Sequence, residues 1–473
     1  MTNGEGKGKT YDWLREFTDT FGNRYVVSDS YDQAIDFLVD YLENSIKVDK
    51  VWTEEVEGIP KWIRNQHPES HPDHAMMMTP RRHFIPVTTL WNTTAAIGED
   101  FENLEAIVVT TFEELENLPS EIVEGKVVVF NEAWGGSYGS TSSYRSRGPS
   151  YAARKGAKAA LIGSVTSLSL YTLHTGSQFY MDEDPATHIP AGCITKEDAE
   201  LLYRLQKKGQ KIVLSLFLNS TFQGWTSKRT VVAEITGSLK PDEMVLFGGH
   251  VDSWDLGTGA LDDGGGVAIT IQTLATIRAL NLHPKRTLRA VFWTAEEEGY
   301  IGGHAFYENH KSESSKISLV MESDSGTFNP LGFRLRAGEK SCEQMLEVMT
   351  LLKSLNADGI DPNTSGPGDP SDFVNNHGVP GVELMTDNDK YWWYHHTGAD
   401  TMTAIVPENL DRCSAVFAVT AYTVANLDDL LDHSTDFVNV CQQKQDSSAS
   451  SSSKASSILV MMALVSFVKT LIY

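Results

Sequence analysis

Residues 245–271 read VLFGGHVDSWDLGTGALDDGGGVAITI, and this stretch decides the fold of the chain. The apolar run Val245-Leu-Phe247 predicts a short buried strand. The glycine-rich turn Leu261-Asp-Asp-Gly-Gly-Gly266 then leads into a predicted helix. The apolar residues of that helix recur at the spacing of one helix face: Val267, Ile271, Leu274 and Ile277. A buried strand that passes through a polar loop into a helix is typical of an α/β protein.

The same order of elements recurs further along the chain. Leu288–Trp293 predicts a strand that ends in three glutamates, and Leu319-Val-Met321 predicts one that leads to Asp324. Val382–Met385 predicts another strand, and Pro407–Leu431 contains a long helix. We therefore expect an α/β fold, with a mixed, mostly parallel sheet flanked by helices. In such sheets ligands bind beyond the carboxyl ends of the strands, where the acidic and histidine clusters fall.

Length and composition set the limits of the interpretation. The 473 residues suggest about three structural units at roughly 150 residues each. Hydrophobic residues make up 41% and charged residues 22%, which excludes a disordered chain or a polytopic membrane protein. The net charge is −24, so contacts along nucleic-acid phosphates are disfavoured, and we expect no nucleic-acid partner.

A middle block forms a separate small α/β unit in the predicted fold. Lys126–Phe130 predicts a buried strand, and Thr195 is expected to cap a helix. Ahead of this block, residues 30–45 predict a helix with Ser30 as its N-cap. The expected division is the N-terminal part of a main domain (1–94), an insert (95–235), the C-terminal part of the main domain (236–441), and a serine-rich spacer with an apolar tail (442–473).

Five short motifs along the chain carry side chains that can bind metal. They are His250-Val-Asp252, Asp262-Asp263, Glu296-Glu297-Glu298, Asp324 and His395-His396. Each motif alone has an ordinary interpretation, because an HxD loop, a helix-start turn or a run of glutamates is usually structural. The glutamates, however, directly follow an apolar strand, and burying several carboxylates without cations is costly.

Together the motifs suit a metal centre better than separate structural roles. Histidine nitrogens and carboxylate oxygens suit zinc, or less specifically other divalent metals. The charges also balance, because two Zn²⁺ ions bring +4 against −4 from four carboxylates: Asp262, Glu296, Glu297 and Asp324. The cofactor we expect is therefore a pair of zinc ions.

The ordered motifs resemble a known family. The segments GGHVDSWDLGTGALDDGGG, FWTAEEEG, MESDSGTF and YHHTGADTMT are similar to those of the dizinc exopeptidases, which include aminopeptidases and glutamate carboxypeptidases. Within that family the motifs resemble those of the glutamate carboxypeptidase branch. The likeness extends to HPKRTLRAVFWTAEE, GWTSKRTVVAEITGS and HIPAGCITKEDAE, and it covers residues 11 to 435. It implies the zinc exopeptidase fold, with residues 95–235 as a protease-associated insert.

The resemblance also implies roles for individual residues. It implies two zinc ions bridged by Asp262, with His250 and Asp324 on one ion and Glu297 and His396 on the other. Glu296 resembles the general base, and Asp252 resembles the residue that orients the first histidine. His396 is preferred to His395 because it lies four residues before Asp400, as in the HxxxDT pattern of the family. Glu298, beside the usual pair, departs from the pattern.

The implied activity is hydrolysis of dipeptides and short peptides by an exopeptidase, of carboxypeptidase or dipeptidase type, that activates water with zinc. An aminopeptidase of the same family is one alternative, because both types use this metal core. A catalytically inactive receptor-like homologue is another, although such proteins usually lose metal ligands. The partners implied are a peptide substrate and a second copy of the chain in a homodimer.

The ends of the chain and its sequons bear on location. The first 17 residues hold no apolar core typical of a signal peptide, so we expect a missing N-terminal segment. The serine-rich spacer and the short apolar tail at 458–473 match a GPI-attachment signal, with Ser447 or a small neighbour as the site. A tail anchor or an irrelevant apolar tail is the alternative. Three sequons permit N-glycosylation in a secreted or cell-surface protein: Asn92, Asn219 and Asn363.

The cysteines exclude one kind of zinc site. No two of the four are spaced as a CxxC pair: Cys193, Cys342, Cys413 and Cys441. A cysteine-bound zinc or a dense disulfide framework is therefore not expected. The sequence leaves one or two disulfides open and does not give the pairing.

Overall fold

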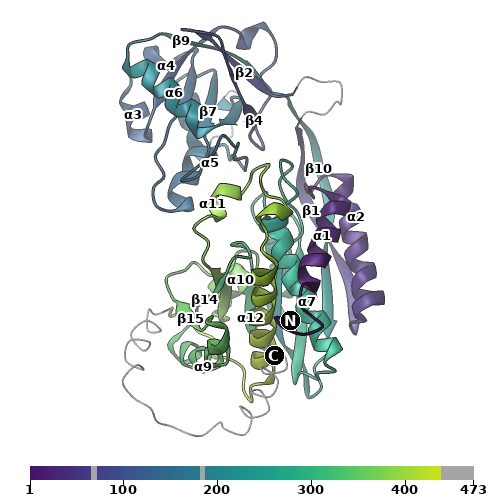
Figure 1. The fold of residues 1–473 in the computed structure, drawn as a ribbon. Coiled ribbons are helices and arrows are strands. Elements are labelled where there is room, and N and C mark those ends of the chain that lie inside the picture. The colour runs from purple at the N-terminus through teal and green to yellow at the C-terminus, as the bar shows by residue number, and fades with distance from the viewer. Residues whose placement is uncertain (65–71, 182–186, 438–473) are drawn as a thin grey trace. The chain divides into compact units, whose positions relative to one another are not determined.

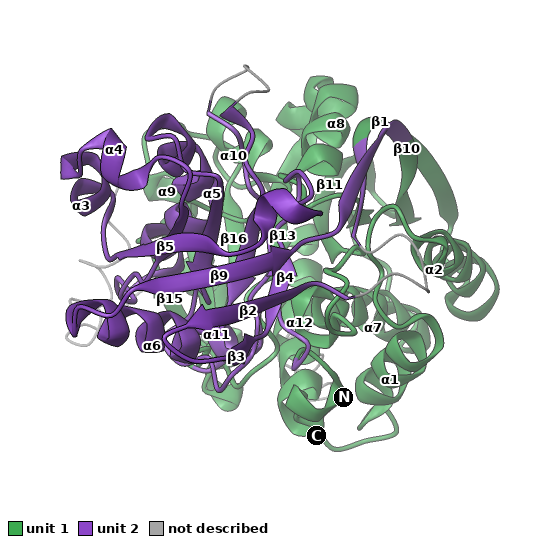
Figure 2. Cartoon of the chain, turned by 90° about the horizontal axis from the view of Figure 1, so that it is seen from above, with its two compact units in different colours: residues 1–59, 227–389, 400–473 green, residues 60–226, 390–399 purple. Residues whose placement is uncertain are grey.

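The computed structural model describes residues 1–64, 72–181 and 187–437, and the chain divides into two compact units (Figure 2). Unit 1 comprises Met1–Ile59, Ser227–Asp389 and Asp400–Tyr473, and unit 2 comprises Pro60–Thr226 and Lys390–Ala399. Each unit has an eight-stranded sheet among its described residues.

The sheet of unit 1 has the strand order β1-β10-β12-β11-β13-β16-β14-β15. Figure 1 labels the strands near its two edges, β1 and β10 on one side and β14 and β15 on the other. Its strands are β1 (Lys50–Arg64), β10 (Ser220–Ile235), β11 (Lys240–His250), β12 (Arg286–Trp293), β13 (Ile317–Glu322), β14 (Pro330–Arg336), β15 (Gly359–Asp361) and β16 (Gly381–Thr386). The central strands β12, β11, β13 and β16 are parallel, while β10 and β14 pair with this core in antiparallel fashion. The predicted mixed, mostly parallel sheet is confirmed.

Helices cover both faces of this sheet. They are α1 (Lys9–Phe21), α2 (Asp29–Asp40), α7 (Gly265–Ala279), α8 (Ile301–His310), α9 (Glu339–Met349), α10 (Ser371–His377) and α12 (Pro407–Asn426). Alternate side chains of β11 pack on opposite faces of the sheet. Phe247 contacts Phe417 of α12, and Leu246 lies in a cluster with Phe306 of α8. Residues Met244–Phe247 of this strand are all apolar because they are buried on both sides.

The parallel register brings the chemistry-bearing loops to one edge. His250 ends β11 and pairs with Trp293, which ends β12. Glu322 ends β13 and pairs with Gly248 of β11. The loops that follow these three strands therefore leave the sheet at the same edge, as expected for a ligand site in an α/β sheet.

Unit 2 has the strand order β3-β2-β9-β5-β6-β7-β8-β4. Its strands are β2 (His74–Thr79), β3 (His83–Ile85), β4 (Val87–Thr89), β5 (Leu104–Val109), β6 (Val127–Phe130), β7 (Ala159–Gly163), β8 (Ala191–Ile194) and β9 (Ile212–Phe217). Its helices are α3 (Phe112–Asn117), α4 (Ser120–Val123), α5 (Tyr138–Arg154), α6 (Lys196–Lys207) and α11 (Tyr391–Tyr394). The insert was expected to begin at residue 95. Unit 2 begins earlier, because β2 and β4 belong to its sheet: β2 pairs with β9, and β4 pairs with β8.

Two local predictions have different outcomes. Thr195 caps α6 as predicted, since its side chain accepts the N–H of Asp198 at 3.1 Å. The predicted cap at Ser30 is wrong: Ser28 is the N-cap of α2, and its Oγ accepts the N–H of Tyr31 at 3.1 Å. Ser28 takes the extended backbone that an N-cap needs, whereas Ser30 already lies in the first helical turn.

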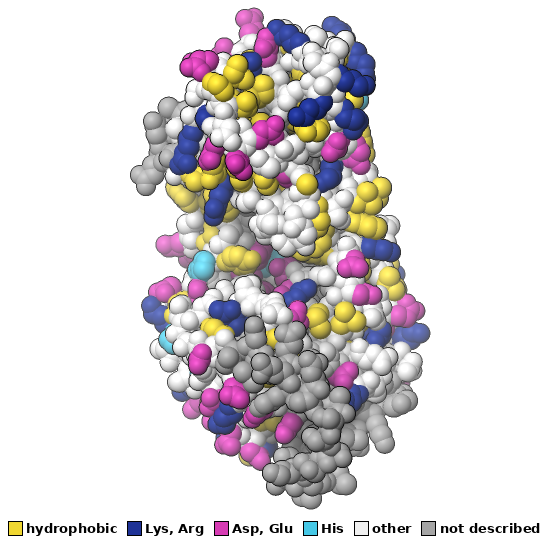
Figure 3. All heavy atoms as spheres, turned by 90° about the vertical axis from the view of Figure 1, so that its left-hand side faces the viewer, with side chains coloured by type: hydrophobic (Ala, Val, Ile, Leu, Met, Phe, Trp, Pro, Cys, Tyr) yellow, Lys and Arg dark blue, Asp and Glu magenta, His cyan; other side chains and the backbone are white. Residues whose placement is uncertain are grey.

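Acidic and basic side chains are mixed on the surface seen in Figure 3. The two kinds are interspersed there, and the acidic side chains form no single patch.

Cys193 and Cys413 are buried free thiols, and Cys342 is disulfide-bonded. In the part of the chain that the structure describes, no helix combines the length and apolar character that crossing a bilayer needs. Ser447 and the apolar tail at 458–473 lie outside the described residues.

Candidate metal centre

His250 is fully buried at the end of β11 and points its Nε2 atom at two carboxylates. Its Nδ1 lies 3.0 Å from the main-chain oxygen of Asp252. Because a carbonyl oxygen only accepts hydrogen bonds, Nδ1 carries the proton and Nε2 carries the lone pair. Nε2 lies 3.4 Å from Asp262 Oδ1 and 3.3 Å from Asp324 Oδ1.

These three ligand atoms fit a divalent cation. They all lie within 4.8 Å of one another. Ligands held about 2 Å from a tetrahedral zinc are about 3.3 Å apart, which matches both distances from His250 Nε2. Burial alone lowers the pKa of His250, but the carboxylates of Glu296, Asp262 and Asp324 outweigh it and raise the pKa well above its ordinary value. The arrangement thus attracts positive charge at Nε2, either a proton or a metal ion.

The loop that presents Asp262 is held by main-chain contacts. Asp400 accepts the N–H of Leu261 at 2.7 Å and that of Asp262 at 3.1 Å. Asp263 Oδ1 accepts the N–H of Gly266 at 3.0 Å at the start of α7. A Cβ added at Gly266 would lie only 2.3 Å from Asp263 Oδ2, so the glycine-rich turn is required by close packing.

Two residues without predicted roles support this loop. The buried guanidinium of Arg24 donates to three main-chain oxygens, those of Val251, Thr258 and Gly259, at 2.7–2.8 Å. Burial lowers the pKa of Arg24 to about 10, although Asp400 and other nearby acids oppose the change. Burial, and then the charge of Asp262, raise the pKa of Asp400 to about 7. The spacing His396-x-x-x-Asp400 pointed to Asp400, whereas no sequence signal pointed to Arg24.

Asp252 holds the glutamate run that follows β12. Its carboxylate accepts the N–H of Glu296 at 3.3 Å and that of Glu297 at 3.2 Å. The same carboxylate is 3.9 Å from His250 Nδ1, so the main-chain oxygen of Asp252 makes the closer contact with the ring. Asp252 therefore links two parts of the site, the histidine and the acidic loop.

The three glutamates differ in exposure and surroundings. Burial is the largest cause that raises the pKa of Glu296, Glu297 and Glu298, and neighbouring carboxylates add to it. The side chains of Glu296 and Asp324 are 12% and 22% exposed, whereas Glu298 is only 4% exposed as a residue. Glu296 is thus the residue of the run that offers a carboxylate to solvent beside His250, at 3.8 Å from its Nε2.

A further carboxyl pair lies at the edge of the cluster. Glu322 is fully buried, and its Oε2 accepts the N–H of Asp369 at 3.1 Å. Burial, and then the charge of Asp324, raise the pKa of Glu322 to about 8. Burial and the charge of Glu322 likewise raise the pKa of Asp369. Neither residue was predicted, because an acid at a strand end and one in a loop carry no spacing signal.

His395 and His396 lie in unit 2, directly after α11. The two rings stack with centroids 3.6 Å apart, and both residues are less than 9% exposed. His396 Nδ1 lies 3.1 Å from the main-chain oxygen of Thr175 and 3.4 Å from Arg145 Nη1. The carbonyl oxygen is the nearer partner and only accepts, so we assign the proton to Nδ1, which leaves on Nε2 the lone pair that a metal needs. Burial, and then the charges of His396 and Arg145, lower the pKa of nearby His174 to about 3, so that ring is neutral.

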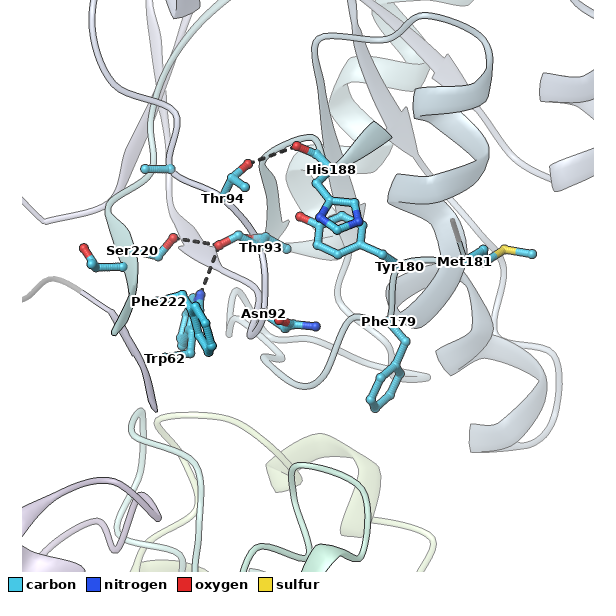
Figure 4. A pocket seen from close by; sticks show the side chains of 12 residues that line it. Trp62, Asn92, Thr93, Thr94, Phe179, Tyr180, Met181, His188, Ser220 and Phe222 are labelled. Atoms are coloured by element: carbon cyan, nitrogen blue, oxygen red, sulfur yellow. Dashed lines mark hydrogen bonds between the residues drawn. The ribbon is translucent and has the colours of Figure 1, made fainter. Parts of the chain in front are cut away.

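Unit 2 also contains a pocket of about 870 Å³ (Figure 4). Its lining is Trp62, Asn92, Thr93, Thr94, Ala95, Phe179, Tyr180, Met181, His188, Ser220, Thr221 and Phe222. The rings of Tyr180 and His188 stack at 3.6 Å within it. None of the lining residues is a carboxylate, so this pocket lacks the donor set of the candidate metal centre.

Comparison with known proteins places the chain in a family. The model of Peptidase family M28 matches residues 230–421. Carboxypeptidase Q of Mus musculus is 42% identical over 91% of this chain and 88% of its own length. The chain belongs to peptidase family M28. The crystal structure of the M28 peptidase precursor of Shewanella amazonensis has a TM-score of 0.83 at 33% identity, over 89% of this M28 peptidase and 94% of that chain. A zinc aminopeptidase of Bacillus subtilis shares the fold, with a TM-score of 0.63 at 16% identity over 88% and 95% of the two chains.

Family membership confirms three expectations. The α/β fold, the resemblance to the exopeptidase family and the metallo-exopeptidase activity of this M28 peptidase are as predicted. The matched region 230–421 contains every residue proposed to bind metal: His250, Asp262, Glu297, Asp324 and His396.

Proposed function

We propose that this M28 peptidase is a zinc-dependent exopeptidase that binds two zinc ions and cleaves dipeptides and short peptides. The observation that carries the proposal is the placement of His250 Nε2, Asp262 Oδ1 and Asp324 Oδ1 at the spacing of metal ligands. The sequence similarity to mouse carboxypeptidase Q supports carboxypeptidase or dipeptidase action.

The residues present fit the two ions. His250 and Asp324 would hold one ion, Glu297 and His396 the other, and Asp262 would bridge them. Every proposed ligand is an imidazole or a carboxylate, and each histidine uses Nδ1 to donate to a main-chain oxygen. Such outer contacts fix the tautomer that metal binding requires.

When bound, two zinc ions would polarise the scissile carbonyl and lower the pKa of a coordinated water. Glu296 would accept the proton of the attacking water, because its side chain, at 12% exposure, is the least buried of the three glutamates. The same carboxyl group would then pass the proton to the leaving amine. Asp252 keeps this base in position through its contact with the main-chain N–H of Glu296.

The test is the variant Glu296→Gln. General-base catalysis contributes about 10²–10⁴-fold, so we expect hydrolysis of a dipeptide to fall at least about 100-fold while the zinc content stays unchanged. The matched control is Glu298→Gln. Its carboxyl oxygens make no hydrogen bond to another described residue, so the amide of the same size should preserve activity. Near-normal hydrolysis by Glu296→Gln would refute the assignment of the base.

An aminopeptidase mode is the second candidate, because the B. subtilis protein of similar fold is a zinc aminopeptidase. Peptides with a blocked amino terminus separate the modes, since a strict aminopeptidase leaves them intact. An inactive receptor-like homologue would give no hydrolysis of any peptide, and the complete donor set argues against it.

We also propose processing in the secretory pathway and assembly as a homodimer. The disulfide at Cys342 supports an oxidising compartment, and Asn363 is an exposed sequon. The homodimer rests on the family resemblance. The GPI attachment expected near Ser447 remains part of this proposal.

A further inference from the structure

The segment that carries His395 and His396 is built onto unit 2. Lys390–Ala399 groups with Pro60–Thr226, although the residues on either side, Asp389 and Asp400, group with unit 1. The contacts that hold this short segment therefore determine where its histidines point.

Thr175 makes a reciprocal pair of hydrogen bonds with His396. The N–H of Thr175 donates to the main-chain oxygen of His396 at 3.0 Å, and His396 Nδ1–H donates to the main-chain oxygen of Thr175 at 3.1 Å. His396 has a φ of 62°, in the left-handed region that non-glycine residues seldom adopt. One residue of unit 2 thus fixes both the backbone and the ring of the histidine.

Tyr138, on the first turn of α5, packs against the same segment. Its ring stacks on Trp392 with centroids 4.6 Å apart and planes 10° apart. The ring meets His395 edge-on at 4.7 Å and His396 at 6.3 Å. Thr166 adds a hydrogen bond from its hydroxyl to the main-chain oxygen of Trp392 at 2.5 Å.

Arg145 joins these two supports. Its guanidinium donates to the main-chain oxygen of Thr175 at 3.0 Å and to the hydroxyl of Tyr138 at 2.5 Å, and it is only 6% exposed. A Cβ at Gly176 would lie 2.3 Å from the guanidinium carbon, so the backbone packs directly on the arginine. Arg145 therefore links α5 to the backbone at Thr175 and Gly176, which orients His396.

We infer that Tyr138 and Arg145 are positioning residues that orient the proposed zinc ligand His396 through Thr175. The inference rests on the proposed function, because it takes His396 as a ligand. Outer contacts of a ligand histidine are worth about 10–100-fold in metal affinity. Loosening them should weaken the second ion and leave the ion at His250 and Asp324 unchanged.

The test is zinc titration of the full chain carrying Tyr138→Ala, with zinc content measured against a competing chelator. We expect one ion at wild-type affinity and the other weakened about 10–100-fold, with hydrolysis recovered at excess zinc. Tyr138→Phe keeps the stacking on Trp392 but loses the hydroxyl that accepts from Arg145, so it should weaken the second ion by less than Tyr138→Ala does. Phe84→Ala truncates a 53% exposed aromatic residue of the same unit and should change neither site.

A second variant guards against a folding defect. Thr166→Val removes the hydrogen bond to Trp392 without opening a cavity, and it should weaken the second ion in the same direction by a smaller factor. Wild-type affinity for both ions in Tyr138→Ala, or equal weakening of both, would overturn the inference. A wild-type chain that binds no zinc would instead overturn the proposed function.

Discussion

The chain without metal should become less stable as the pH rises from 5 to 8, and Asp400 should be responsible for much of this loss. Its carboxylate is buried beside Asp262, and burial is the main cause that raises its pKa from 3.8 to about 7. The folded chain without metal therefore holds this proton more tightly than the unfolded chain. Between about pH 4 and pH 7 the unfolded state releases the proton first, so the free energy of unfolding falls as the pH rises.

The magnitude follows from the two pKa values. Each tenfold change in proton affinity is worth about 1.4 kcal/mol, so the full change contributes about 4 kcal/mol. Of this, about 3 kcal/mol is lost between pH 5 and pH 8, most of it below pH 7, and the contribution is flat above pH 8. Bound zinc should reduce the effect, because its charge offsets that of Asp262.

Urea unfolding of the chelated protein at pH 5 and pH 8, followed by circular dichroism, measures this. The matched variant Asp400→Asn stays neutral at both pH values and keeps an oxygen that can accept an N–H. We expect the loss of stability between the two pH values to be smaller in the variant by up to about 3 kcal/mol. Equal losses in the two chelated proteins would show that Asp400 is not responsible.

Two further substitutions test the packing beneath the site. Gly266→Ala would place a Cβ 2.1 Å from the main-chain oxygen of Ser323, so we expect a loss of about 1–3 kcal/mol in urea unfolding. Gly139→Ala, where no atom lies within 4 Å, should not destabilise the chain. Arg24→Met leaves three main-chain oxygens without their donor and removes a buried cation among acids, so it should cost about 3–5 kcal/mol. Arg15→Met, at a half-exposed position, should change the free energy of unfolding by less than about 0.5 kcal/mol; a comparable loss there would contradict the role given to Arg24.

The main sheet could be predicted because its central strands are buried on both faces. Val245–Phe247 is apolar throughout for that reason, and a polar loop follows it where the sheet ends. The candidate ligands in unit 1 could be predicted for the same reason, since His250 ends such a strand and Asp324 lies two residues after another.

The remaining features depend on contacts that one sequence does not encode locally. Arg24 reaches Val251 across 227 positions of the chain, and nothing in its neighbourhood marks it. The main-chain oxygen of Asp252 contacts His250, although the sequence drew attention to the carboxylate. The grouping of Lys390–Ala399 with unit 2 depends on tertiary contacts such as the stacking of Trp392, which periodicity does not reveal.

The two free thiols among the described residues offer a way to follow each unit separately. Cys193 lies in unit 2 and Cys413 in unit 1, and each is at most 1% exposed. Burial also raises the pKa of Cys193 to about 11, which suppresses the reactive thiolate in the folded state. A thiol reagent should therefore modify each cysteine only when its own unit opens. Mass spectrometry of the labelled peptides would then give two opening rates from one sample of the unmutated chain.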